Sequence, residues 1–220
     1  MSLKAKLLAV FLALAVAFGG GAWVGFHMDR GDVDPQDHIT TVFTPYEDGS
    51  DAYIAFLAKA KKSVHMAVYA YTDPRITDTL VELKRNNPKI EIRLLFDYSQ
   101  TQGWSGKTIM AQTERLRAAG IEVTFGTSEK SKDLMHSKFT VVDGEWVEDG
   151  SWNYTRAADS QANVQNYVRS KKRAALFLAN WERMHRFMKS QNLEPKLPDD
   201  DKSKPATPAP AGKPTKKRSR

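Results

Sequence analysis

The spacing of apolar positions changes repeatedly along residues 39–194, which indicates strands and helices in alternation. Short runs rich in β-branched and aromatic residues predict strands, and apolar residues that recur every three or four positions predict helices. The predicted strands span residues 40–44, 63–71, 90–96 and 121–125, and the predicted helices span residues 51–62, 74–86, 105–119 and 176–188. This order predicts a layered α/β/α fold with a central mixed sheet.

The first 27 residues have a different pattern, with two lysines followed by a long apolar run. Counted to Phe18, the run has the length of a signal-peptide core, and small residues at 15–17 offer a cleavage site. Counted to Phe26, it approaches the ~20 residues that span a bilayer. Residues 1–27 are therefore predicted to be a signal peptide or an N-terminal membrane anchor, with membrane association through residues 5–26. Both alternatives predict export, to the periplasm or the outer face of a bacterial inner membrane.

Two further segments flank the folded body. Residues 28–38 read as a polar linker, and residues 195–220 as a disordered basic tail rich in Pro and Lys. The net charge of +7 lies mostly at the ends, with +2 in residues 1–30 and +4 in residues 199–220. A basic end attracts nucleic acid or anionic lipid, and equally well serves as a solvated tail. The absence of cysteine excludes disulfides, thiolate metal sites and a cysteine nucleophile.

Residues 135–153 have the pattern of a β-hairpin whose polar residues are not placed at random. Asp143-Gly144 is a strong two-residue turn signal between strand-like segments. With that turn, the residue numbers of two positions that face each other across the hairpin add up to 287. His136 should therefore face Ser151, and Lys138 should face Asp149. Strand side chains alternate faces. We therefore expect His136, Lys138, Ser151 and Asn153 on one face, Phe139, Val141 and Trp146 on the core face, and Gly150 where a ligand approaches closely.

These polar groups suit a phosphodiester. A neutral imidazole can attack phosphorus and form a covalent intermediate. Lys138 and Asn153 can bind the non-bridging oxygens, whose charge must be stabilised in the transition state. Because lysine supplies the positive charge, the sequence predicts no metal and no other cofactor. A surface hairpin with incidental polar residues is the alternative, and the spacing of the whole set disfavours it.

The pattern His136-x-Lys138-x4-Asp143-x6-Gly150-Ser151-x-Asn153 resembles the HKD motif of the phospholipase D superfamily. Residues 67–74 and 96–100 resemble the same proteins, and the likeness covers roughly residues 40–190. The resemblance implies a phospholipase D-like catalytic domain over residues 39–194 with one motif per chain. The resemblance is strongest to the small bacterial Nuc-type endonucleases, which are exported and dimeric, and to related mitochondrial proteins.

The resemblance also implies a role for each residue of the motif. His136 would be the nucleophile that forms a phosphohistidine. Lys138 and Asn153 would hold the phosphate with support from Ser151, and Asp143 would be a structural or orienting residue. The family uses two histidines, and no other histidine of this chain has a lysine two residues later. A homodimer with a second His136 is therefore implied.

One position departs from the family pattern. Single-motif nucleases usually carry Asn-x-Glu-Asn after the motif, and that glutamate orients the catalytic histidine, whereas this chain has Gln165 there. Gln165 can still accept a hydrogen bond from the imidazole through its amide oxygen, but it lacks a charge. Asp143 or Asp149 could replace the glutamate, or catalysis could be weakened.

Three functions are compatible with these features. A non-specific, metal-independent endonuclease acting on DNA or RNA is the leading hypothesis. A membrane-anchored phospholipase D or cardiolipin hydrolase is the second, and a catalytically weakened nucleic-acid-binding module is the third. Trp104, in a loop between a strand and a helix, could stack on a base of the substrate, or could anchor its loop on the body.

Overall fold

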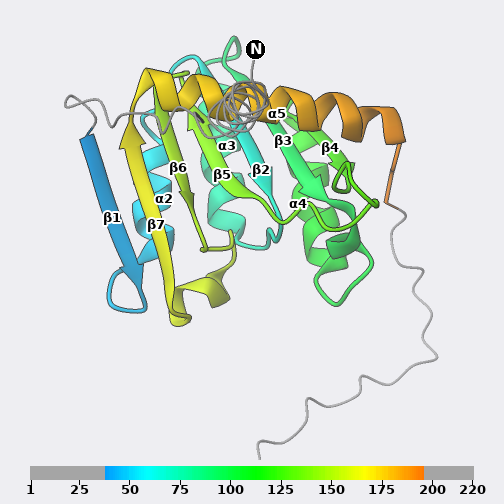
Figure 1. Ribbon diagram of the computed structural model, residues 1–220, viewed down its shortest axis with the longest axis horizontal. Coiled ribbons are helices and arrows are strands. Elements are labelled where there is room, and N and C mark those ends of the chain that lie inside the picture. Colours follow the sequence, from blue (N-terminus) through cyan, green and yellow to red (C-terminus); the bar gives the residue numbers. More distant parts are fainter. Residues whose placement is uncertain (1–37, 196–220) are drawn as a thin grey trace, which may run out of the picture. The chain divides into compact units, whose positions relative to one another are not determined.

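A seven-stranded mixed sheet runs through the computed structural model, which describes residues 38–195 (Figure 1). The strand order is β1-β7-β6-β5-β2-β3-β4. The strands are β1 (His38–Thr44), β2 (Ser63–Val68), β3 (Glu91–Asp97), β4 (Glu122–Gly126), β5 (Lys138–Val142), β6 (Trp146–Gly150) and β7 (Asn163–Arg169). The three strands β2, β3 and β4 are parallel, and every other neighbouring pair is antiparallel.

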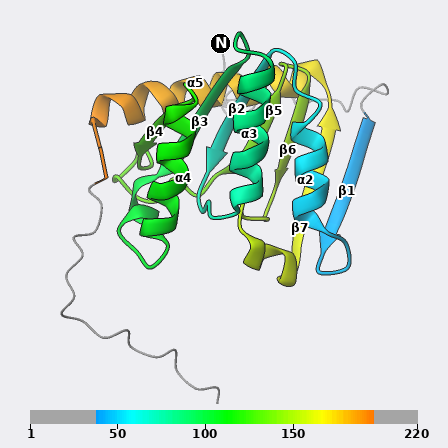
Figure 2. The ribbon, with the colours of Figure 1, turned by 180° about the vertical axis from the view of Figure 1, so that it is seen from behind.

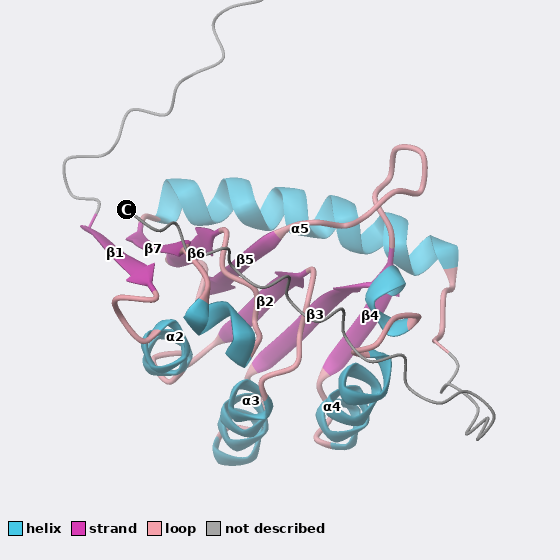
Figure 3. Ribbon diagram, turned by 90° about the horizontal axis from the view of Figure 1, so that it is seen from below, coloured by secondary structure: helices cyan, strands magenta, loops and turns pink. Residues whose placement is uncertain are grey.

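Helices cover both faces of this sheet. They are α2 (Gly49–Leu57), α3 (Pro74–Asn86), α4 (Gly106–Ala118) and α5 (Lys171–Gln191), with short 3₁₀ helices η1 (Tyr98–Thr101) and η2 (Arg156–Ser160). Seen along the layers, α2, α3 and α4 lie on one face, and α5 crosses the other (Figures 2 and 3). The predicted α/β/α fold with a mixed sheet is confirmed.

The predictions for the two ends of the chain, a signal peptide or anchor, a linker and a basic tail, fall on residues 1–37 and 196–220, outside the described residues. Within residues 38–195, none of the helices is long and apolar enough to cross a bilayer.

The strand predicted for residues 63–71 ends at Val68, and two further predictions of secondary structure need correction. The helix predicted for residues 51–62 ends at Leu57, because the backbone N–H groups of Lys61, Lys62 and Ser63 donate to the Asp143 carboxylate. Strand β7 was not predicted, although it lies between β1 and β6. Its alternation of polar and apolar residues is weak, and its pairing partners are distant in the sequence.

The two faces of the sheet carry separate apolar clusters. The larger one packs α2, α3 and α4 on the sheet and includes Trp152 and Tyr154. The smaller one packs α5 against β2, β3, β5 and β6, and the buried Trp181 of α5 donates its indole N–H to the Met66 carbonyl at 2.8 Å. Because each face is buried by its own helices, the sheet has a fixed position between them.

A carboxylic acid lies inside the larger cluster. Glu148 is fully buried, and burial raises the pKa of its carboxyl to about 8. Its Oε2 accepts a hydrogen bond of 2.9 Å from the Tyr154 hydroxyl, and Thr140 lies opposite it on β5. Glu148 is therefore protonated in the folded protein at neutral pH.

The substitution Glu148→Gln should change how stability depends on pH. An unfolded glutamate loses its proton above its ordinary pKa of 4.5, whereas the folded one keeps it up to about 8. Between these values the wild type should lose up to about 1.4 kcal/mol of unfolding free energy per pH unit relative to Glu148→Gln. Urea unfolding of both proteins from pH 5 to 8 measures the difference.

Subtracting the variant removes contributions that both proteins share, such as that of His65, whose pKa is lowered by burial and which therefore favours stability at higher pH. Glu114→Gln, on the exposed surface of α4, is the matched control and should run parallel to the wild type. Parallel curves for Glu148→Gln as well would show that Glu148 is already ionised in the folded protein.

Candidate active site

The hairpin β5–β6 is present, but its register differs by one residue from the predicted one. Val142 faces Trp146 and Phe139 faces Asp149, so facing positions sum to 288. The turn Asp143-Gly144 closes as expected, with Glu145 N–H donating to Val142 at 3.1 Å. Glu145 then bulges out of the pairing, because its carbonyl accepts the N–H of Ser170 at the end of β7.

The register decides which faces the side chains occupy. Lys138 lies opposite Gly150 by this register, on the face that α2 and α3 cover. Trp146 shares a face with Val142, so the prediction that it points with Phe139 and Val141 is wrong. Because Lys138 faces Gly150 and side chains alternate along a strand, Ser151 points to the other face of the sheet. The prediction that Ser151 and Lys138 lie on one face is therefore also wrong.

Asp143 has a structural role at the turn, far from His136. It has φ of 57°, and its carboxylate accepts backbone hydrogen bonds of 2.7–3.1 Å from residues 61–63. Five strand residues, roughly 16 Å, separate it from Lys138. Asp149 forms an ion pair with Arg173 of α5. Neither carboxylate therefore lies where it could orient His136 of the same chain.

His136 and Lys138 lie together at the edge of the sheet where β2 ends. The His136 ring packs on Tyr69 with 4.3 Å between centroids, and the side chain is exposed. Lys138 Nζ lies 3.1 Å from the His136 carbonyl oxygen, 3.3 Å from His136 Nε2 and 4.9 Å from the Tyr69 ring centre. The sequence prediction that these two side chains converge is confirmed by these contacts.

Lys138 is buried without a carboxylate partner. Only 9 % of the residue is exposed, and burial lowers the pKa of its ammonium group. Within residues 38–195, no Asp or Glu forms an ion pair with it. A phosphate oxygen beside His136 would supply the missing negative charge.

Gly150 and Ser151 are close to β7 rather than to a ligand. A Cβ at Gly150 would lie 2.0 Å from the Val164 carbonyl oxygen, so glycine is required there by the neighbouring strand. The neighbouring strand thus accounts for the glycine, and the close approach of a ligand to it stays a prediction. Ser151 Oγ donates to Asn163 Oδ1 at 3.0 Å and accepts from the Val164 N–H at 3.1 Å.

Asn153 is positioned by the segment that follows β2. Tyr154 N–H donates to Ala70, and the Tyr154 carbonyl accepts from Thr72 and Asp73. Trp152 and Tyr154 are fully buried on either side of Asn153. Asn153 Oδ1 is buried without a hydrogen-bond partner in the described part of the chain. Its amide is thus fixed near the end of β2 with unused hydrogen-bonding capacity.

Gln165 does not orient His136 in this chain. It is fully buried, its Nε2 donates to the Gly49 carbonyl at 3.3 Å, and its Oε1 accepts from the Tyr167 hydroxyl at 3.2 Å. Both ends of the amide are occupied by groups in the core. In residues 38–195, no hydrogen bond joins Ser151, Asn153 or Gln165 to His136 or Lys138.

Trp104 follows η1 and is completely exposed. It is therefore not packed on the body as a loop anchor. Since β2 and β3 are parallel, the loops that follow them lie at one edge of the sheet. Trp104 follows β3, and Tyr69, which contacts His136, follows β2, so both belong to this edge.

Asp97 holds the segment that carries His136, a role that the sequence did not reveal. Its carboxylate is buried and accepts the Met135 N–H at 2.6 Å, directly before His136. The same carboxylate accepts from the N–H and the hydroxyl of Ser99. Asp97 lies in the stretch 96–100 that resembles the family, but only the fold brings it to Met135.

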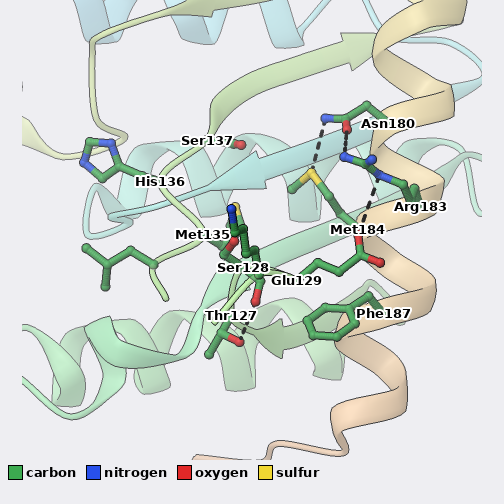
Figure 4. A pocket seen from close by; sticks show the side chains of 12 residues that line it. Thr127, Ser128, Glu129, Met135, His136, Ser137, Asn180, Arg183, Met184 and Phe187 are labelled. Atoms are coloured by element: carbon green, nitrogen blue, oxygen red, sulfur yellow. Dashed lines mark hydrogen bonds and ion pairs between the residues drawn. The ribbon is translucent and has the colours of Figure 1, made fainter. Parts of the chain in front are cut away.

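A cavity of about 600 Å³ lies beside His136, between the β4–β5 connection and α5 (Figure 4). His136 lines one end, and Met184 and Phe187 of α5 lie at the other. No group of three or more potential metal ligands lies together within residues 38–195.

Residues 53–185, more than half of the chain, match the family model described as "Cardiolipin synthase, PLD-like domain". The chain belongs to the phospholipase D superfamily. With His136 and Lys138 in place, it is a phosphodiesterase of that superfamily.

Curated relatives in this superfamily carry lipid-related names. A protein named phospholipase D from Rickettsia conorii is 30% identical over 146 residues, covering 65% of this chain and 67% of the relative. A mitochondrial cardiolipin hydrolase from Chlamydomonas reinhardtii is 31% identical over 116 residues, covering 52% of this chain and 46% of the relative.

Two solved structures share the fold of this chain. Nuc from Salmonella typhimurium matches with a TM-score of 0.60 at 23% identity, over 67% of this chain and 93% of Nuc. NucT from Helicobacter pylori matches with a TM-score of 0.61 at 17% identity, over 69% of this chain and 97% of NucT.

Asp97→Asn should lower the rate of phosphodiester cleavage. An amide has one acceptor oxygen in place of two, so it cannot accept hydrogen bonds from both Met135 and Ser99. The segment before His136 would then shift, and a small displacement of the nucleophile lowers the reaction rate. We expect kcat on bis(p-nitrophenyl) phosphate to fall roughly 10- to 100-fold with little change in KM. Steady-state kinetics at a temperature where the variant is folded checks this.

Asp133→Asn is the matched control, because that exposed carboxylate lies in the same loop and, among residues 38–195, accepts only the adjacent Leu134 N–H. Equal kcat values for wild type and Asp97→Asn would exclude a positioning role for Asp97.

Proposed function

We propose that this phosphodiesterase is a metal-independent, non-specific endonuclease that cuts nucleic acid through a phosphohistidine intermediate. The observation that carries the proposal is the exposed His136 beside the buried Lys138, which has no Asp or Glu partner within residues 38–195. With 3.3 Å between His136 Nε2 and Lys138 Nζ, the pair offers a nucleophile and a cation side by side, which suits phosphoryl transfer.

The proposed reaction has two steps. An unprotonated ring nitrogen of His136 attacks phosphorus, and the bond from phosphorus to the leaving oxygen breaks. A protonated His136 of the partner subunit gives that oxygen its proton. The same partner histidine then takes a proton from water, whose oxygen attacks phosphorus and breaks the N–P bond.

Trp104 supports nucleic acid as the substrate. An exposed indole costs free energy in water, and base–aromatic stacking is sequence-tolerant. Its loop lies at the sheet edge to which His136 also belongs. The sequence resemblance to single-motif bacterial endonucleases points the same way.

A homodimer is part of the proposal, because each chain has one HKD motif. Exposed apolar side chains, Phe43 and Tyr46, line a mainly apolar hollow together with Ser151 of the motif. A second copy covering this surface would bury the apolar groups and bring its own motif nearby.

A phospholipase or cardiolipin hydrolase is the second candidate. The curated relatives at 30–31% identity bear those names, and the apolar run at residues 5–26 would suit an enzyme at a membrane. Export to the periplasm or the outer face of an inner membrane is proposed for both candidates. Fractionation of cells expressing the full chain or a deletion of residues 1–27 tests it; a cytoplasmic full chain would refute export.

Purified full-length protein in EDTA should cleave plasmid DNA, and His136→Ala should reduce the rate by at least about 10³-fold, as expected for loss of a nucleophile. His38→Ala, another exposed histidine, is the matched control. Phosphatidyl lipid vesicles are assayed in parallel. Cleavage of lipid alone would support the second candidate, and DNA binding without turnover a weakened binding module.

Phe43→Lys should shift the protein from dimer to monomer in light scattering. Activity should then fall roughly tenfold or more at concentrations where the subunits separate, and recover on concentration. Ile39→Lys, also exposed and on the same face of β1 but four residues further from the hollow, is the control. A fully active monomer would refute the shared active site.

A further inference from the structure

We infer that the cavity beside His136 is a nucleoside subsite, which receives the base next to the scissile phosphate. This inference rests on the proposed nuclease function. The cavity is separate from the contact of His136 with Lys138 and Tyr69, because its walls come from the β4–β5 connection and from α5.

The walls are held in place from both ends. Gln191 of α5 accepts the Thr127 N–H at 3.0 Å and donates to the Thr127 hydroxyl at 2.8 Å. At the other end, the Asp97 carboxylate accepts the Met135 N–H. The loop over the cavity is thus fixed to α5 on one side and to β3 on the other, which favours a preformed site.

The lining suits a flat, heterocyclic group. Met135, Met184 and Phe187 provide thioether and aromatic surfaces, and sulfur and aromatic groups pack well on rings. The volume of about 600 Å³ lies within the roughly 300–1,000 Å³ range of small-molecule sites.

Polar groups stand at the side of the same cavity. The Asn180 Nδ2 contacts Met184 Sδ at 3.3 Å, and the Asn180 Oδ1 accepts from Arg183 at 3.1 Å (Figure 4). Arg183 Nε also lies 3.9 Å from Glu129, another residue of the lining. An amide and a guanidinium can bind the polar edge of a base, whereas an acyl chain offers neither group a hydrogen-bond partner.

An oligonucleotide with a single cleavable linkage tests the subsite. Every linkage except one is a methylphosphonate, and the base on one side or the other of the remaining phosphodiester is replaced by an abasic residue. With the wild type, removal of the base that enters the cavity should lower kcat/KM about tenfold, within the range for stacking on one base.

Phe187→Ala and, separately, Asn180→Ala should reduce that preference to threefold or less and leave the rate on the abasic oligonucleotide unchanged. Phe177→Ala is the matched control, because Phe177 lies on the same helix and packs on Phe139, outside the cavity. It should retain the full preference.

The outcomes separate the two proposals. A wild type that cleaves these oligonucleotides with no preference, or variants that retain it, would overturn the subsite and leave the nuclease intact. A wild type that cleaves no oligonucleotide but hydrolyses phosphatidylglycerol vesicles would overturn the nuclease. If the cavity variants then lost lipid turnover, the cavity would bind a lipid head group instead.

Discussion

The antiparallel pairing of β5 with β2 is the constraint on which the site depends. Lys138 pairs with Val68, so the first residue of β5 lies at the last residue of β2. His136 and Lys138 consequently emerge at the edge where the parallel strands also end. Loops after parallel strands carry their side chains to this same edge, and Asp97 and Trp104 arrive there from β3.

Electrostatics at this edge favour a bound anion. The fold buries Lys138 and gives it an imidazole, a carbonyl and a ring face as neighbours, but no carboxylate from the described part of the chain. The available carboxylates have other partners: Asp143 holds a loop, Asp149 pairs with Arg173, and Asp97 accepts backbone N–H groups. A buried cation without a counter-ion is unfavourable, and a phosphodiester would relieve that cost.

The same arrangement explains how substrate choice can differ within one superfamily. The hairpin supplies the groups for phosphorus, whereas the surroundings that touch the rest of the substrate belong to other elements. Here these surroundings are the β4–β5 connection, α5 and the loop of Trp104. Their aromatic, thioether and amide groups are the features on which the proposed nucleoside subsite rests.

The sequence by itself determined the layered fold, the turn at Asp143-Gly144 and the meeting of His136 with Lys138. Each of these follows from local spacing, since residues two apart on a strand share a face and Asp-Gly tolerates positive φ. Only the tertiary structure decided the hairpin register, the partners of Gln165, the position of β7 and the role of Asp97. Glu145 bulges because its carbonyl bonds to Ser170, and Gln165 is occupied by Gly49 and Tyr167. These contacts join residues far apart in the chain or depend on the packing of a buried strand, so they leave no periodic signal in the sequence.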